Sequence, residues 1–275
     1  MTHSPAGAPL PNLALIDQAQ QAIADFERSV APGMWPYLDK ATLVAEMRAR
    51  IADPFQINQG GQPFCGPAAI AFELVRKQPV RYVEICRSLY EVGSFQSKTR
   101  RVEATSRLRQ SQGRLRMGQA DWMLLSTLRD SENLLFPVDP GAPDVMRNLS
   151  GMTKSWEMKG WVREILGYRD VKYDHTYLFG EFEALTEAAE VIASGGVAFA
   201  LITAEGLLQN KQPLLPYPSH WITLVGNIVI QKGQFLKHDS GHFSCDIYSW
   251  AKQMKVDADE GPFEDYFWGV VLGRP

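Results

Sequence analysis

The sequence predicts an α+β fold in which a helical half of the chain packs on an antiparallel β-sheet. Apolar residues recur at helical spacing through most of the chain as far as Gly196, and shorter apolar or alternating runs of strand length follow it. Helices that precede strands in this way are typical of α+β proteins. The chain has 275 residues, 45% of them apolar, which is enough to bury a substantial core.

The helical half begins after a loose arm, residues 1–12, which contains three prolines. We expect Asp39 to cap a helix over 39–54 that Pro54 ends, and we expect Pro67 in the first turn of a helix over 66–78. The full set of predicted helices covers residues 15–30, 39–54, 66–78, 79–93, 118–135, 154–168 and 182–196.

Four runs after Gly196 have the length or alternation of β-strands. The predicted strands cover residues 197–204, 220–231, 233–240 and 265–273. We expect five tryptophans to lie in the core or to line a cleft: Trp156, Trp161, Trp221, Trp250 and Trp268.

Charge and composition limit the partners and the compartment. With 28 basic and 31 acidic residues the formal charge is −3, so no overall field favours nucleic acid or membrane. No run reaches the ~18 apolar residues of a membrane helix, and the first residues lack the pattern of a signal peptide. Three cysteines are too few for a disulfide framework. We therefore expect a protein that is cytoplasmic as made.

Residues 98–116 form the main charged segment, with seven Lys or Arg residues and one acidic residue, Glu103. Such a run is most often a solvated surface. It could instead be a patch that binds an acidic partner.

Cys65 follows a Gly- and Gln-rich loop and opens the predicted helix over 66–78. At the first turn of a helix a cysteine meets the positive end of the helix dipole, which favours the thiolate. A nucleophilic thiol also needs a base. His220 opens a predicted strand and Asp239 ends the next one, so the two could meet at neighbouring strand ends. Gln59, six residues before Cys65, could turn its amide towards the thiol.

Other interpretations of the same residues remain open. Cys65 could be a buried, inert thiol, as we expect Cys86 and Cys245 to be. The stretch "HDSGHFSC" contains His238, His242 and Cys245, with Asp239 available, and these residue types can bind zinc. Its spacing is not that of a zinc finger. His238 and His242 also compete with His220 for the role of the base.

Taken together, Gln59, "CGPAA" at a helix start, His220 and Asp239 resemble the papain-like cysteine peptidase superfamily. The most similar type is the double-glycine-leader peptidase of bacteriocin transporters, in which Asp replaces Asn. The resemblance implies that Cys65 is the nucleophile, His220 the general base and acid, and Asp239 the orienting group. Gln59 and the Cys65 backbone N–H would stabilise the oxyanion. It implies no cofactor and no metal.

The resemblance also implies a domain organisation and a reaction. Residues 1–55 would be an accessory arm with helices, and 56–275 a papain-like catalytic domain with a helical insertion at 79–190. The expected reaction is hydrolysis of an amide through a thioester, most simply in a protein or peptide substrate. The alternatives are a glutamine deamidase or transglutaminase-type effector toxin, delivered by a specialised secretion system, and a catalytically inactive papain-like binding module.

Overall fold

The computed structural model describes residues 12–132, 153–176, 180–231 and 241–275. Contacts divide the chain into two compact units, each of which is described by itself. A helical unit falls within residues 10–157 and 164–167, and a sheet unit within residues 158–163 and 168–275. The combination of helices with an antiparallel sheet confirms the predicted α+β class.

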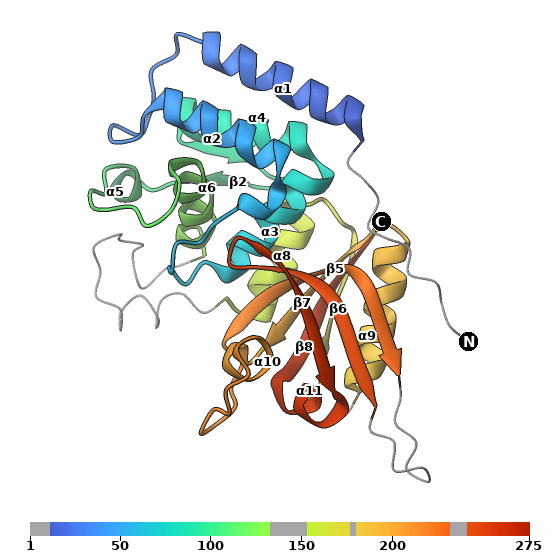
Figure 1. The fold of residues 1–275 in the computed structure, drawn as a ribbon. Helices are drawn as coiled ribbons and strands as arrows, with labels where there is room; N and C mark the ends of the chain where they lie inside the picture. The colour runs from blue at the N-terminus through green and yellow to red at the C-terminus, as the bar shows by residue number, and fades with distance from the viewer. Residues whose placement is uncertain (1–11, 133–152, 177–179, 232–240) are drawn as a thin grey trace. The chain divides into compact units, whose positions relative to one another are not determined.

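The described part of the helical unit contains helices and a short hairpin (Figure 1). Among the described helices, none combines the length and apolar content needed to cross a membrane. The elements in chain order are α1 (Leu13–Arg28), α2 (Lys40–Ala52), the 3-10 helix η1 (Pro54–Gln56), α3 (Cys65–Lys77), α4 (Pro79–Val92), β1 (Ser94–Gln96), β2 (Arg101–Glu103), α5 (Ser106–Arg109) and α6 (Gln119–Asp130), followed by the ends of α8 (Ser155–Glu164).

Local sequence signals set the boundaries of these helices. Asp39 caps α2, as predicted, because its carboxylate accepts the Thr42 N–H at 2.7 Å. Gly93 ends α4 in the left-handed conformation, with φ 77°. In α3 every residue from Cys65 to Val75 is buried, and the helix packs on α4 and α6. Helix α3 is therefore the central element of its unit.

The sheet unit is built on six strands in the order β3-β8-β4-β5-β6-β7, with every neighbouring pair antiparallel. Helix α9 packs on β4, β5 and β8, and these elements with β6 enclose an apolar core (Figure 1). The elements are β3 (Asp170–His175), α9 (Glu181–Ala193), β4 (Val197–Ile202), α10 (Ala204–Gln209), β5 (His220–Gln231), β6 (His242–Ser249), β7 (Lys252–Asp259), α11 (Glu260–Tyr266) and β8 (Phe267–Arg274).

The cysteines and tryptophans differ in their exposure from one another. Cys86 and Cys245 are buried, as expected. Trp156, expected in the core or lining a cleft, does not lie in the core, because 69% of it is exposed. The buried face of α8 carries Met158, Trp161 and Val162 at helical spacing, and a residue two positions before Met158 points away from that face. The strand expected over 233–240 lies outside the described residues.

A buried ion pair connects α2, α6 and the segment before α3. Arg50 NH2 lies 2.7 Å from Asp121 Oδ2, and the same oxygen accepts the backbone N–H of Asn58 at 3.1 Å. Asp121 is 1% exposed and Arg50 9%. Burial raises the pKa of Asp121, and the hydrogen bond and charge of Arg50 oppose that rise. The pair therefore orders the chain immediately before Gln59.

Removing the carboxylate of this pair should destabilise the helical unit strongly. Asp121→Ala leaves Arg50 buried without its counter-charge, so we expect the free energy of unfolding to fall by about 3–5 kcal/mol in urea titrations. Glu27→Ala breaks the exposed pair with Arg48 and is the matched control, with a much smaller expected effect. Equal effects of the two substitutions would contradict the anchoring role of Asp121.

Candidate functional site

Cys65 is the first residue of α3, as the sequence predicted. Its side chain is buried, with 8% of the residue exposed. The N-cap residue, Phe64, makes no side-chain capping hydrogen bond, and Pro67 contributes no backbone N–H. The first turn therefore directs the positive end of the helix dipole and its backbone donors towards the position of the thiol.

The loop before Cys65 turns sharply at two glycines. Gly60 and Gly61 have φ angles of 58° and 72°. A Cβ on Gly60 would come within 2.4 Å of the Arg116 carbonyl oxygen, so this position requires glycine for space as well as for conformation. The Gly60 N–H donates to Asn58 Oδ1 at 2.8 Å. The Gly-Gln composition seen in the sequence thus serves a compact turn.

Gln59 lies on this loop, with its side chain held by the loop itself. Its Nε2 donates to the Gln62 carbonyl at 3.0 Å, while the Gln62 N–H donates to the Gln59 carbonyl at 2.9 Å. A carboxamide nitrogen carries two N–H donors, so this bond occupies one of them. Gln59 is therefore fixed in a turn that leads directly to Cys65.

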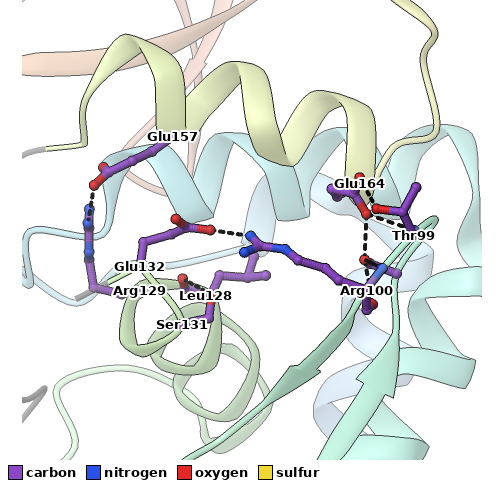
Figure 2. Close-up of polar contacts among 9 residues, drawn as sticks. Thr99, Arg100, Leu128, Arg129, Ser131, Glu132, Glu157 and Glu164 are labelled. Atoms are coloured by element: carbon purple, nitrogen blue, oxygen red, sulfur yellow. Dashed lines mark hydrogen bonds and ion pairs between the residues drawn. The ribbon is translucent and has the colours of Figure 1, made fainter. Parts of the chain in front are cut away.

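Two buried polar residues that the sequence analysis did not assign lie beside the residue after Cys65. A Cβ on Gly66 would come within 2.4 Å of Thr153 Oγ1. Thr153 Oγ1 accepts from Arg129 NH1 at 3.3 Å, and Arg129 NH2 pairs with Glu157 Oε1 at 3.0 Å (Figure 2). The signal for this cluster is an arginine inside the apolar helix pattern over 118–135.

Part of the basic segment 98–116 pairs with carboxylates of the helical unit. Arg100 forms an ion pair with Glu132, and Glu164 accepts from the Thr99 N–H at 2.9 Å and its hydroxyl at 2.8 Å (Figure 2). The exposed basic residues of the segment include Arg107, Arg114 and Arg116.

His220 is the first residue of β5, as predicted. Only 5% of it is exposed. Its Nε2 lies 2.7 Å from Ser249 Oγ at the end of β6, and its ring stacks on Trp250 with centroids 4.9 Å apart and planes at 28°. Burial lowers the pKa of His220 to about 4, so the imidazole is neutral at pH 7.

Asp239, predicted to orient His220, lies outside the described residues, as does His238. The neighbour of His220 that the structure does describe, Ser249, was not predicted. Serine carries no charge and forms no recognisable motif, so only the pairing of β5 with β6 could have identified it.

The described part of the "HDSGHFSC" segment separates His242 from Cys245. The two are three positions apart on β6, so their side chains lie on opposite faces of the sheet. Cys245 belongs to the apolar core, whereas His242 Nε2 lies 3.1 Å from Asp257 Oδ1 on β7. Among the described residues there is no group of three or more His, Cys, Asp or Glu that could hold a metal ion.

The thiols of Cys86 and Cys245 are not activated as nucleophiles, because burial favours their protonated forms. Burial raises the pKa of Cys86 to about 12 and raises that of Cys245 further. Both remain protonated at neutral pH.

In comparisons with known proteins, no family model and no curated protein sequence matches the chain.

The space beside Cys65 can be tested through Gly66. A methyl group there would overlap Thr153, so Gly66→Ala should lower the free energy of unfolding by about 1–3 kcal/mol. Gly160→Ala in α8 is the control, because a Cβ there meets nothing within 4 Å and alanine favours helix by up to about 1 kcal/mol. Urea titrations measure both. A stabilising effect at both positions would show that Thr153 does not confine the helix start.

The buried imidazole should make the sheet unit sensitive to acid. Because the pKa of His220 is about 4 in the fold and near 6.5 when unfolded, its contribution is complete above pH 6.5 and falls away between pH 6.5 and 4. The expected loss is about 3 kcal/mol.

Urea titrations from pH 7 to 4 can isolate this loss. His220→Gln should remove it, whereas His242→Gln, a change at the partly exposed histidine of the same sheet, should retain it. An unchanged acid dependence in His220→Gln would show that the burial of His220 is not its source.

Proposed function

We propose that the chain is a cysteine-dependent hydrolase that cleaves amide bonds through a thioester, most simply as a papain-like peptidase. The observation that carries the proposal is the position of Cys65 at the start of α3, a helix buried from Cys65 to Val75, directly after the turn that holds Gln59. The sheet unit supports it independently with a buried, neutral histidine at the start of β5.

The proposed reaction needs one thiol, one base and donors for the oxyanion. As Cys65 Sγ attacks the amide carbonyl carbon, its proton passes to His220 and the carbonyl π electrons move onto oxygen. Gln59 and the Cys65 N–H donate to that oxyanion. When the carbonyl re-forms, the C–N bond breaks and His220 gives the proton to the leaving amine.

Water completes the cycle. His220 takes a proton from water while the water oxygen attacks the thioester carbonyl carbon and the carbonyl π electrons move onto oxygen. When the carbonyl re-forms, the C–S bond breaks and His220 returns the proton to Cys65. Asp239 remains assigned as the orienting group through the family resemblance.

Two alternatives share parts of this site. A glutamine deamidase or transglutaminase-type effector toxin forms the same kind of thioester from a glutamine side chain, with release of ammonia. The acyl group then passes to water or to an amine. A catalytically inactive papain-like module would bind a partner and turn over nothing. The basic segment 98–116 suits an acidic partner in either case, since Arg107, Arg114 and Arg116 are exposed. Synthesis in the cytoplasm, with delivery outside by a specialised secretion system, belongs to the same proposal.

Cys65→Ala tests the proposal directly. We expect the wild-type chain to release coumarin from members of a tetrapeptide-aminocoumarin library, and Cys65→Ala to reduce the rate more than about 10³-fold because the nucleophile is lost. Gln59→Ala should reduce it by about 10²–10³-fold. Cys86→Ala, which removes a buried thiol of α4, is the control and should retain activity.

The same preparations distinguish the alternatives. Release of ammonia from glutamine peptides, without coumarin release, indicates the deamidase or transglutaminase. A chain that turns over neither substrate, and in which iodoacetamide modifies Cys65 no faster than Cys86 or Cys245, contradicts a catalytic role for Cys65 and leaves the binding module.

A further inference from the structure

The hairpin between β6 and β7 has an unusual two-residue turn. Ser249 pairs with Lys252, so Trp250 and Ala251 alone form the connection. Their φ angles are 49° and 58°. Tight hairpins of this kind require positive φ at both positions and normally use Asn-Gly or Asp-Gly. Residues with a Cβ adopt this conformation at a cost, and it persists where the surrounding contacts demand it.

The contacts that hold this turn in its positive-φ conformation are made with His220. The turn sets Trp250 against the imidazole, at 4.9 Å between ring centroids, and the residue before it supplies Ser249 Oγ at 2.7 Å from Nε2. Ser249 is 2% exposed and His220 5%. Two consecutive residues therefore hold one ring, one through its face and the other through a ring nitrogen.

We infer that Ser249 and Trp250 position the imidazole of His220, so that Nδ1 is the ring nitrogen left to exchange a proton. The hydrogen bond that the structure describes for the ring is made by Nε2. In the inferred arrangement Ser249 Oγ accepts from Nε2–H, which leaves the lone pair of the neutral ring on Nδ1. The catalytic meaning of this arrangement rests on the proposed function, whereas the arrangement itself does not.

Ser249 and Trp250 can also stabilise the positive charge of a protonated His220 ring. When Nδ1 takes a proton, the imidazolium donates more strongly to Ser249 Oγ, and the indole face of Trp250 attracts the positive charge. Burial opposes that charge, so these two contacts are the described ones that offset it. Ser249 and Trp250 thus give His220 two orienting contacts that were not predicted from the sequence.

Nitrogen NMR of the full chain tests the arrangement without a substrate. With ¹⁵N-histidine labelling at pH 7, the His220 signal is assigned by its absence in His220→Gln. We expect the Nε2–H tautomer in the wild type, a shift towards Nδ1–H or a mixture in Ser249→Ala, and retention in Ser249→Thr. Ser244→Ala, at another buried serine of β6, is the control and should leave the signal unchanged. An Nδ1–H tautomer in the wild type, or an unchanged one in Ser249→Ala, overturns the inference.

The turn is tested by two glycine substitutions. Ala251→Gly relieves the backbone and keeps the indole, so it should raise the urea midpoint and leave the His220 signal in place. Trp250→Gly also relieves the backbone but removes the stack, so it should move the pKa of His220 from about 4 towards 6.5 in an NMR titration. Equal His220 signals and titrations in the two variants overturn the role of Trp250.

Kinetics connect the arrangement to catalysis. On a substrate cleaved by the wild type, Ser249→Ala should lower kcat roughly 10–100-fold with KM little changed, since it removes one hydrogen bond to a group that becomes charged. Ser249→Thr should restore most of this loss.

The failures of the two proposals are distinguishable. A His220→Gln variant with full activity contradicts the proposed function while the NMR result still decides the tautomer. Full activity in Ser249→Ala, beside an inactive His220→Gln, overturns the present inference alone. Loss of activity in Ser249→Ala with full activity in Cys65→Ala would make Ser249 itself the nucleophile and overturn both.

Discussion

The burial of α3 on every side is the constraint on which the helical unit depends. A helix that no water reaches must use small residues where neighbouring helices approach and must compensate every charge it carries. Gly66, Ala68, Ala69 and Ala71 meet the first demand. Glu73 has no exposed surface, and its charge is compensated by Arg76, which donates to both carboxylate oxygens. A deeply buried helix of this kind has little freedom to tilt, so its first residue, Cys65, is held in place by packing along the whole helix.

The same requirement acts on the polar groups around the start of α3. Asp121 compensates Arg50 and also accepts the Asn58 N–H, and Arg129 connects Thr153 to Glu157. These charges are buried because the apolar helices around them are closely packed, and they stay paired because an isolated buried charge is costly. They order the approach of the chain to α3, which is the property that a nucleophile and its oxyanion donors require.

Burial has a different consequence for His220. Its neutral form is favoured at neutral pH because the sheet unit excludes water from the ring. A neutral imidazole has one protonated and one bare nitrogen, so the contact made by one nitrogen decides the chemistry of the other. In the described residues that contact is Ser249, whose place at the end of β6 depends on two shifts in the register of β5 and β6, at Leu224/Gly226 and Gly226/Val229.

Whether a strand or helix could be predicted from the sequence depended on its burial pattern. Strands β4, β5 and β8 were recognisable because apolar residues dominate or alternate along them. Strand β7 was missed because it is an edge strand, and its lysines and aspartates, which suit an exposed edge, resemble a loop. Strand β6 was missed because its serines at 244 and 249 are buried, which breaks the polar-outside pattern. Trp156 was expected in the core or lining a cleft, but the face of α8 that carries it is exposed.

The sequence by itself determined the α+β class, the cap at Asp39, the position of Cys65 at a helix start and that of His220 at a strand start. Each of these follows from local preferences of residues a few positions apart: apolar spacing, capping side chains, and the conformations of glycine and proline. The tertiary structure alone decided that Ser249 and Trp250 hold His220 and that Thr153 lies against Gly66. Those pairs are separated by 29 to 87 residues, and only strand register and helix packing bring their side chains together.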